Sequence, residues 1–597
     1  MINSTSTSTS SYAARSYSSR WAYLASRGVY VIPWLFPLLT AIGLAGIILP
    51  AFGWLPALGY NSFSLAPWQQ LLATPGLWTM ILTTLFTGVG ATLLSLLLTM
   101  VFLISSWNTR LWKLTGRTLP PLLAIPHSAL AIGVVFLLSP SGIVSRILAV
   151  PMDWLHPPDL LTVNDPWGLG LIFALVLKEV PFLCLMLIAA VSQTPIERLL
   201  TTGRSLGYSH LQCWLKLVWP LLYPKIRLSV MIVLAFSLSV VDVSLIIGPN
   251  MPPLLPVQIL QWQQDPDPAL ALAAAAGALL LLLLVGLCMA CWLQLEKVLT
   301  SGLRGWLTGG YRGRSRSILI TSGRLLFSGL LVLAWISLIV VVIWSFSWRW
   351  RFPDIVPSDI SLRAWIRFFP GMLEPLQTTI TVALTCSVVG VLLSVFCLEY
   401  CHRLSRWQQR SIVFFFYLPL LLPQMSFLLG IQTPLVALHL DGYWWTVAAC
   451  HLLYVFPYCY LSLVDPWQKY DQRFSHAGLI LSGSRVRTFL KVKLPMLISP
   501  LFTALALGVA VSTALYLPTV MAGAGRYETL TTEAVALASG GNRRLLALYA
   551  VMQMLVPMIF FGLAIAVPRL SSLRLSSLRL SSLRRNHSPP KRSTHES

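Results

Sequence analysis

The sequence is poor in charged residues, and acidic residues are the scarcer kind. Only 10% of its 597 residues are charged, with 42 lysines and arginines against 19 aspartates and glutamates, whereas 56% are hydrophobic. A soluble domain carries about 25% charged residues. The composition therefore excludes an ordinary soluble globular protein and indicates a chain that lies mostly within a membrane.

The sequence also lacks the motifs of nucleotide hydrolysis and of metal chemistry. It contains no Gly-x4-Gly-Lys-Ser/Thr phosphate loop and no polar stretch large enough to form a nucleotide-binding domain. Its histidines form no HxxH or HExxH pattern, and the pair Cys288 and Cys291 lies in an apolar run without a second pair of ligands. We therefore expect no enzymatic activity, no cofactor and no metal site in this chain, and any ATP hydrolysis must occur in a separate subunit.

The chain does contain a long series of apolar runs, each able to cross a bilayer, which takes about 20 residues in a helix. Uninterrupted apolar runs suit helices and do not suit the alternating strands of a membrane barrel. The sequence predicts an all-α polytopic membrane protein with about twelve transmembrane helices. The predicted spans cover residues 30–53, 77–104, 118–140, 166–191, 226–247, 269–294, 325–347, 376–399, 411–434, 444–464, 498–520 and 546–567.

Positive charge gathers in alternate connections between these spans. If the N-terminus lies inside, most of the 42 basic residues fall in cytoplasmic segments, as the positive-inside rule requires. We therefore expect a multi-pass protein of a bacterial inner membrane with both termini in the cytoplasm. The net charge of +23 then reflects orientation and contact with anionic membrane lipid, and we expect no nucleic acid partner.

A basic, glycine-rich linker divides the predicted spans into two sets of six. Each half has an even number of spans, so both enter the membrane in the same direction, as two parallel six-helix repeats. Pro126 precedes Gly133 by seven residues in the third span, and Pro423 precedes Gly430 by seven in the ninth. The predicted divisions are a cytoplasmic tail (1–29), a first half (30–294), the cytoplasmic linker (295–324), a second half (325–567) and a basic low-complexity cytoplasmic tail (568–597).

Residues 194–225, here named the first loop, join the fourth span to the fifth on the predicted cytoplasmic side. Gly207 can end a first helix in the left-handed conformation. Ser209 can then cap a short second helix that runs to Pro220. The sequence predicts a helix–turn–helix that lies across the cytoplasmic surface.

Residues 470–500, here named the second loop, repeat this design between the tenth and eleventh spans. A break at Ser482–Gly483 is followed by a possible cap at Ser484 and by a short basic helix. The break and Pro495 are thirteen residues apart, as are Gly207 and Pro220 in the first loop. Two copies at equivalent places indicate a duplicated functional element.

The two loops resemble the "EAA" loops of binding-protein-dependent ABC importer permeases, whose pattern is Glu-Ala-Ala, three residues, Gly, and a distal Leu-Pro. Neither loop has the glutamate, and the second lacks the glycine in register, with Gly483 one residue later. The residues at the pattern's positions are Thr201, Thr202, Gly203, Gly207, Trp219 and Pro220 in the first loop, and His476, Ala477, Gly478, Ser482, Leu494 and Pro495 in the second.

The resemblance extends over nearly the whole chain. Two fused six-span halves look like the ferric-iron and thiamine importer permeases, and the segment Leu515–Gly541 looks most like an uncharacterised thiamine-permease-like branch. The resemblance implies a permease subunit that forms the solute pathway by alternating access. It also implies that the two loops dock two copies of a cytoplasmic ATP-binding subunit, and that a periplasmic solute-binding protein delivers the solute.

Three ionisable residues fall inside predicted spans, where a charge is costly and usually faces a cavity or a partner. Lys178 and Glu179 lie in the fourth span and Asp242 in the fifth. They either line the solute pathway or have a buried structural role. A secondary, ion-coupled transporter with 6+6 helices is the alternative function, because Glu179 and Asp242 could serve as its coupling carboxylates. A membrane-embedded enzyme would need a cluster of catalytic residues that this sequence does not show.

Overall fold

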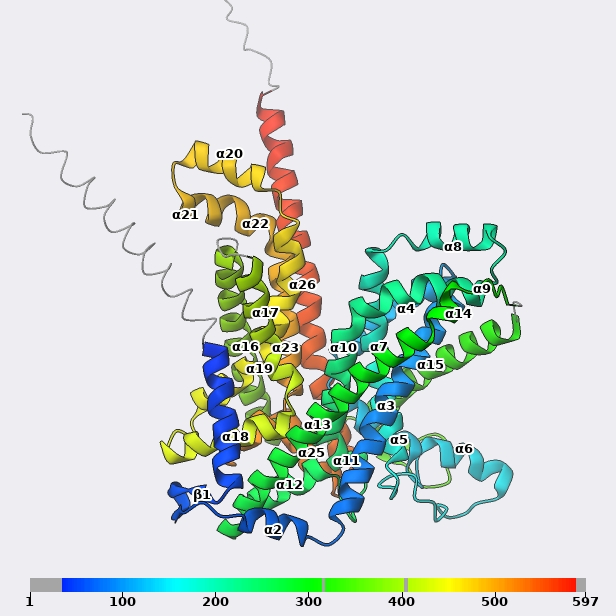
Figure 1. Ribbon diagram of the computed structural model, residues 1–597, viewed down its shortest axis with the longest axis vertical. Helices are drawn as coiled ribbons and strands as arrows, with labels where there is room; N and C mark the ends of the chain where they lie inside the picture. The colour runs from blue at the N-terminus through cyan, green and yellow to red at the C-terminus, as the bar shows by residue number, and fades with distance from the viewer. Residues whose placement is uncertain (1–34, 314–316, 402–405, 587–597) are drawn as a thin grey trace, which may run out of the picture.

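The structure is a computed structural model that describes residues 35–313, 317–401 and 406–586, and most of these residues are helical (Figure 1). Within these ranges the strands are confined to two short antiparallel pairs. The expected all-α fold is therefore confirmed. The pairs are β1 (Trp54–Leu55) with β2 (Tyr60–Asn61), and β3 (Ser347–Arg349) with β4 (Asp359–Ile360).

Long apolar helices account for the predicted membrane spans. Nine helices in the described ranges are long and apolar enough to cross a membrane, and two pairs bent at a short break raise the number to eleven. A shorter apolar helix, Leu35–Ala51, lies where the first span is predicted. Every predicted span therefore overlaps an apolar helix, and the expected polytopic membrane protein is confirmed.

From the fourth span of each half onward, the helices before the linker and those after it follow one another in the same order. Before the linker lie η1 (Pro56–Leu58), α2 (Ala66–Leu72), α3 (Leu77–Ser106), α4 (Arg110–Ala124), α5 (His127–Leu138), α6 (Ile143–Met152), α7 (Leu169–Ser192), α8 (Ile196–Ser205), α9 (His210–Cys213), the π-helical turn η2 (Trp214–Val218), α10 (Trp219–Ser239), α11 (Asp242–Ile247), α12 (Leu255–Gln264) and α13 (Pro268–Gly302). The linker contains α14 (Arg304–Thr308).

After the linker, α19 corresponds to α7, α20 to α8, α21 to α9 and a second π-helical turn, η3, to η2. Leu169 begins the fourth span and Trp444 begins the tenth, whereas Ser209 and Ser484 cap α9 and α21. The number of residues between Leu169 and Trp444 equals the number between Ser209 and Ser484. The elements are α15 (Ser317–Phe346), α16 (Arg363–Cys401), α17 (Arg406–Leu421), α18 (Gln424–Ala437), α19 (Trp444–Gln468), α20 (Gln472–Ser482), α21 (Arg485–Thr488), η3 (Phe489–Lys493), α22 (Leu494–Met496), α23 (Ile498–Ala514), α24 (Leu517–Gly523), α25 (Leu530–Ala538) and α26 (Arg543–Asn586).

Several predicted spans are broken helices. Pro126 separates α4 from α5, and Pro423 separates α17 from α18, which are bent by 98° relative to each other. The residue before a proline avoids the helical region, and Ile125 is accordingly extended, with ψ of 132°. The fifth and eleventh spans break without a proline, at Val240 and Leu515, whose ψ angles of 130° and 118° are alike.

The first helix of each half packs against the third span of the other half. Gly46 of the helix Leu35–Ala51 meets Gly430 of α18 so closely that a Cβ on Gly46 would lie 1.9 Å from the carbonyl oxygen of Gly430. Similarly, a Cβ on Gly133 of α5 would lie 2.7 Å from the carbonyl oxygen of Ser337 in α15. The two glycines of the Pro-x6-Gly repeat therefore make equivalent contacts between the halves.

Two helices extend beyond their predicted limits. α13 continues to Gly302, into the predicted linker, and α26 continues to Asn586, into the predicted low-complexity tail. Residues Arg574, Arg579 and Arg584 of the tail repeat thus lie in a helical backbone, although their five-residue period gives no apolar stripe at helical spacing.

Candidate functional site

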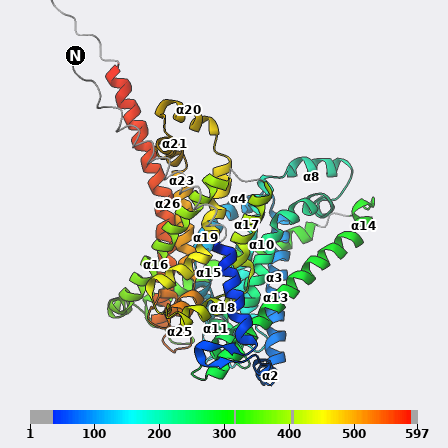
Figure 2. The ribbon, with the colours of Figure 1, turned by 60° about the vertical axis from the view of Figure 1, so that its left-hand side comes forward.

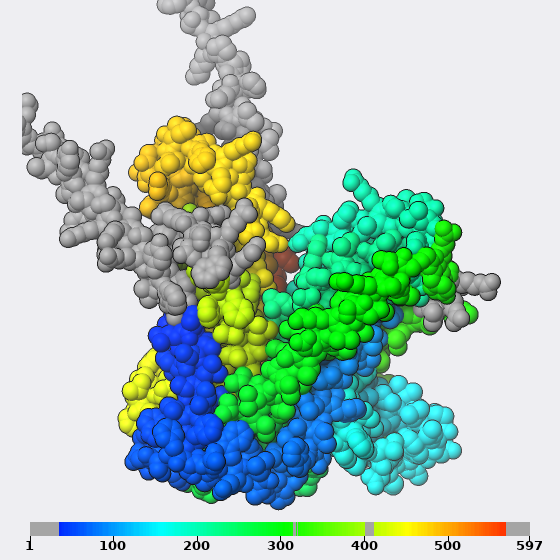
Figure 3. All heavy atoms as spheres, in the orientation of Figure 1, coloured from blue at the N-terminus to red at the C-terminus, as the bar shows by residue number. Residues whose placement is uncertain are grey.

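Both loops lie at one end of the helix bundle, here named the loop end. α8 and α20 share this end in two views, and α2 and α12 lie at the opposite end (Figure 1, Figure 2). In the space-filling view the two loops form separate lobes with a notch between them (Figure 3). The loops are therefore placed so that two separate partner surfaces can approach from one side.

The first loop folds into the two helices that its sequence predicts. α8 is followed by Gly207 with φ of +84°, the left-handed turn expected there. The hydroxyl of Ser209 accepts a hydrogen bond from the backbone N–H of Gln212 and caps α9 (3.5 Å). Leu200 and Trp214 are buried against the adjoining ends of α3 and α7, so the apolar side of this loop is fixed on the bundle.

The second loop follows the same plan with a one-residue shift at its turn. Gly483, with φ of +63°, ends α20 in the left-handed conformation. Gly483 thus ends the helix in place of Ser482, the residue at the glycine position of the EAA pattern. The hydroxyl of Ser482 instead lies 2.8 Å from the hydroxyl of Thr488. Ser484 accepts a hydrogen bond from the backbone N–H of Arg487 and caps α21 (3.4 Å).

A glycine allows the two helices of each loop to touch. A Cβ on Gly203 would lie 2.7 Å from Sγ of Cys213 and from Cδ1 of Leu217. A Cβ on Gly478 would lie 2.9 Å from Cγ2 of Thr488, at the equivalent place. Contacts under 3.0 Å force a neighbour to move, so the loops need glycine at the second alanine position of the EAA pattern.

The short second helix ends near its proline in the second loop, at Met496, but runs past Pro220 into α10 in the first loop, so that part of the prediction is wrong for the first loop only. Pro220 and Pro495 each follow a π-helical turn and sit in the first turn of the next helix. Proline donates no N–H and clashes with the carbonyl four residues back, and a widened π-helical turn relieves both conflicts. The first loop thus continues into α10, whereas the second bends by 72° between Arg485–Met496 and Ile498–Ala514.

The remaining pattern residues divide into an exposed and a packed group. Thr201 and His476, which occupy the glutamate position, are both exposed, and the hydroxyl of Thr201 donates to the carbonyl of Glu197 (2.8 Å). Thr202 and Ala477 are also exposed, whereas Trp219 and Leu494 are half-buried. The exposed positions face outward in both loops and are free to meet a partner.

The second loop presents an apolar surface with a basic rim. Leu481 is 88% exposed and Leu490 is 53% exposed. The exposed apolar residues are Ile480, Leu481, Val486 and Leu490, and the exposed basic residues beside them are Arg485, Arg487 and Lys491. A cluster of exposed apolar side chains with a polar rim is typical of a protein-docking surface.

Lys178 lies at the break in the third span. Its buried ammonium donates hydrogen bonds to the backbone carbonyls of Leu122 (3.2 Å), Leu123 (3.1 Å) and Ile125. These carbonyls lie where Pro126 interrupts the helix and would otherwise lack partners. The positive charge also lies at the C-terminal end of α4, where the helix dipole favours a cation.

Glu179, Asp242 and His127 form a polar cluster on packed helices of the first half. Oε1 of Glu179 lies 3.4 Å from Nε2 of His127, the first residue of α5 after the proline break. Asp242 begins α11 at the break in the fifth span, and α11 packs against both α5 and α7. The structure thus places two of the three predicted intramembrane residues on helices that pack together.

Sequence reasoning missed His127 as a member of this cluster. His127 immediately follows Pro126, so the proline break is the signal that could have found it. His451, which also falls within a predicted span, bonds to the hydroxyls of Ser512 (2.8 Å) and Thr519 (2.9 Å). It is therefore hydrogen-bonded in the packed interior.

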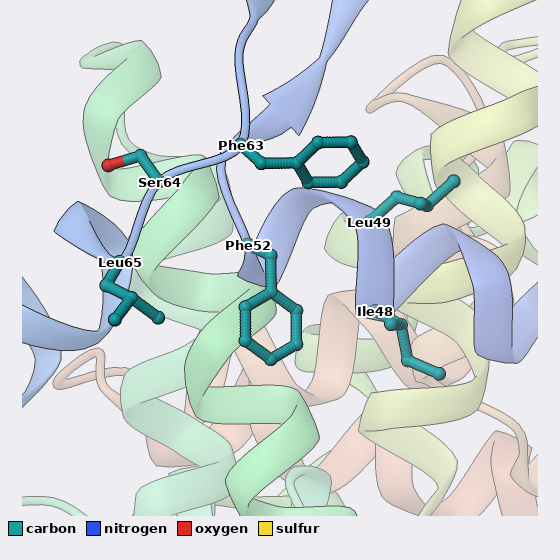
Figure 4. A pocket seen from close by; sticks show the side chains of 6 residues that line it. All are labelled: Ile48, Leu49, Phe52, Phe63, Ser64 and Leu65. Carbon is teal, nitrogen blue, oxygen red and sulfur yellow. The ribbon is translucent and has the colours of Figure 1, made fainter.

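An apolar hollow lies at the end opposite the loops (Figure 4). Its volume is about 350 Å³, and its lining is formed by Ile48, Leu49, Phe52, Phe63, Ser64 and Leu65. Ser64 supplies the only side-chain polar group of this lining. Nothing in the hollow can recognise a charged solute, so it does not serve as the functional site.

Comparison with known proteins gives full-length and half-length relatives. The chain is 32% identical over 510 residues to the inner membrane ABC transporter permease protein YnjC of Escherichia coli K12, covering 85% of this chain and 91% of that protein. It is 24% identical over 218 residues to a protein named as a permease of a 2-aminoethylphosphonate transport system, PhnV, from Salmonella paratyphi A, covering 36% of this chain and 80% of that protein. No family model matches the chain.

Proposed function

Because the chain belongs to the family of ABC transporter permeases, we propose that it is the membrane subunit of an ATP-driven importer in a bacterial inner membrane. It is composed of two fused six-span halves that form the solute pathway between them. The loop end faces the cytoplasm, together with both termini. The chain hydrolyses no ATP itself, and two copies of a separate ATP-binding subunit supply the energy.

The observation that carries this proposal is the pair of equivalent loops at one end of the bundle. In the first loop a π-helical turn joins the capped short helix to α10, and in the second loop the capped helix ends at Met496 and meets α23 at a bend of 72°, so a push on either loop is passed to the next span. The exposed apolar residues of the second loop, with their basic rim, suit a partner groove with acidic edges. Each loop therefore docks one ATP-binding subunit, and closure of the two subunits rocks the halves.

The solute pathway passes the polar cluster of Glu179, Asp242 and His127. His127 and Asp242 lie at helix breaks, and Glu179 lies beside His127 within α7; broken spanning helices commonly frame the binding sites of transporters. α25 of the second half packs against both α5 and α11, so the site lies where the two halves meet. Movement of one half relative to the other would take this site apart, as alternating access requires. Lys178 supports the broken helix and does not bind solute.

The test of the proposed function is co-purification with an ATP-binding subunit of the same organism. The expected complex has one permease chain and two ATP-binding chains, and it is lost when Gly203→Val and Gly478→Val are combined. Substitution Gly286→Val, at a helical glycine of α13 with open space around it, is the matched control and leaves the complex intact. A permease that recruits no ATP-binding chain, and takes up solute in response to a proton gradient alone, would instead be a secondary transporter.

The solute and its delivery form a finer part of the proposal. A buried carboxylate at Glu179 and a half-buried one at Asp242 favour a solute with a positively charged group, which agrees with the resemblance to thiamine and ferric-iron importers and less well with the phosphonate named for PhnV. A periplasmic solute-binding protein presents the solute at the end opposite the loops. Uptake of labelled thiamine, ferric iron and 2-aminoethylphosphonate by reconstituted vesicles distinguishes these solutes directly.

A further inference from the structure

The linker between the two halves is fixed on the first loop. α14 lies beside α9 at the loop end (Figure 1). The backbone N–H of Ser209 donates to the carbonyl of Arg312 (2.9 Å). Close packing adds to this bond, because a Cβ on Gly207 would lie 3.3 Å from Cδ of Arg312 and a Cβ on Gly313 would lie 2.9 Å from Cγ of Gln212. The linker therefore covers the turn and the short helix of the first loop.

Lys216 holds the linker in place. Its ammonium donates to the carbonyls of Gly309 (2.9 Å) and Tyr311 (3.2 Å), at and beyond the C-terminal end of α14, and lies 4.8 Å from the centre of the Trp306 ring. Lys216 is consequently buried, with 8% of its surface exposed. The equivalent residue of the second loop is Lys491, which is exposed and has no such cover in the described residues.

The covered loop lacks the basic rim that the second loop carries. The positions equivalent to Arg485, Arg487 and Lys491 are His210, Gln212 and Lys216, and the last two are buried. The linker brings exposed groups to this place instead. Arg304 and Arg312 are exposed, and Tyr311 is 65% exposed. The linker thus adds positive charge and apolar area to those of the first loop itself, where Arg204 is exposed and Leu206, at the position equivalent to Leu481, is 55% exposed.

We propose that residues 304–313 of the linker form part of the first docking surface, in which Arg312 and Tyr311 join Arg204 and Leu206 of the first loop to match the basic rim and apolar patch of the second loop. The inference rests on the proposed function. Two copies of one ATP-binding subunit present the same acidic-edged groove twice, so the permease must offer two chemically similar surfaces. The second loop builds its surface from its own helix, and the first loop builds it together with the linker.

A titration of the ATP-binding subunit against the full-length permease in nanodiscs tests the proposal. Arg312→Glu should weaken binding by about threefold to tenfold, the range for loss of a surface ion pair combined with repulsion, and Arg487→Glu should have a similar effect. The backbone hydrogen bond from Ser209 and the two bonds from Lys216 do not depend on the Arg312 side chain, so the linker should stay in place in this variant. Lys297→Glu, on the exposed cytoplasmic part of α13, is the matched control and leaves binding unchanged.

Limited trypsin digestion of the permease alone checks the cover on the first loop. Lys216→Met should increase cleavage at Arg304 and Arg312, whereas Lys491→Met should leave cleavage of the linker unchanged. Wild-type affinity for Arg312→Glu with lost affinity for Arg487→Glu would overturn the composite surface and leave the proposed function standing. Unchanged linker cleavage in Lys216→Met would overturn the role of Lys216. Failure of the wild-type permease to bind the ATP-binding subunit would overturn both the inference and the proposed function.

Discussion

Gly46 and Gly430 pack backbone against backbone, and Gly43, one helical turn before Gly46, completes the contact. A Cβ on Gly430 would lie 1.8 Å from the carbonyl oxygen of Gly43, and one on Gly46 would lie 1.9 Å from that of Gly430. The hydroxyl of Thr433 donates to the carbonyl of Gly46 (2.9 Å) and adds a polar contact between the same helices. Small residues at close helix contacts are the usual basis of association in membranes.

Substitution Gly430→Ala is expected to destabilise the protein by about 1–3 kcal/mol or more, because the added methyl group meets backbone that cannot move aside. The measurement is the thermal unfolding midpoint of the purified protein in detergent. Gly286→Ala, with nothing within 4 Å of the new methyl group, is the control and should leave the midpoint unchanged. Equal midpoints for the two variants would show that these helices are not packed closely in the membrane.

Substitution Gly203→Ala or Gly478→Ala should weaken the coupling of ATP hydrolysis to transport, because the methyl group forces the two helices of a loop apart. The expected result is a lower rate of solute uptake per ATP hydrolysed in reconstituted vesicles. Gly116→Ala, at an exposed position of α4 with open space around it, should behave as wild type. Wild-type coupling in both loop variants would contradict the helix contact described for the loops.

Substitution Lys178→Met should lower stability and leave the affinity for solute unchanged in the protein that still folds. It removes hydrogen bonds to three carbonyls at a helix break, and each unsatisfied buried group costs about 1–3 kcal/mol. The measurements are the yield of folded protein, its unfolding midpoint and the KM for uptake. A raised KM with an unchanged midpoint would instead place Lys178 in the solute pathway.

Substitutions Glu179→Gln and Asp242→Asn should weaken solute binding and leave stability nearly unchanged, the opposite of what is expected for Lys178→Met. Both are close in shape to the native residue and remove one negative charge, so the fold should persist while binding of a cationic solute weakens. A raised KM with a nearly unchanged unfolding midpoint is the expected result in uptake assays. Normal uptake by the double variant would remove this cluster from the pathway.

Removal of exposed apolar area from the second loop should reduce the affinity for the ATP-binding subunit. Leu481 is 88% exposed in the permease alone, so Leu481→Ser should not alter the permease's own stability. Its burial in a partner groove would contribute about 1.5–3 kcal/mol, so the substitution should weaken binding by about tenfold or more. The matched control is Val298→Ser, at an exposed apolar position of α13, and equal affinity for both variants would exclude Leu481 from the interface.

Local signals in the sequence accounted for much of the fold. Apolar runs located every span, and the serines before the short loop helices, Ser209 and Ser484, are the caps that their spacing predicted. A cap depends on residues two or three positions away, so it can be read without knowledge of the tertiary structure. The breaks at Val240 and Leu515 could not be predicted, because no proline or glycine marks them.

Contacts between distant segments were beyond the sequence. The sequence showed the glycine of the Pro-x6-Gly repeat. It did not show that the first helix of the other half packs against Gly430. Lys178 was recognised as a costly charge, and its pairing with another helix was expected, yet the carbonyls that it satisfies became evident only with the fold. The same holds for Lys216, whose partners in the linker lie more than ninety residues away.

The exchange of first helices between the halves sets an order for biosynthesis. The helix Leu35–Ala51 leaves the ribosome early, but Thr433, which bonds to Gly46, lies 387 residues further along the chain. Until α18 has been inserted, the contact face of this helix around Gly46 has only lipid or an insertion factor to cover it. The helix must therefore wait in the bilayer through most of translation, and a nascent chain truncated before the ninth span should be a preferred target for membrane proteases.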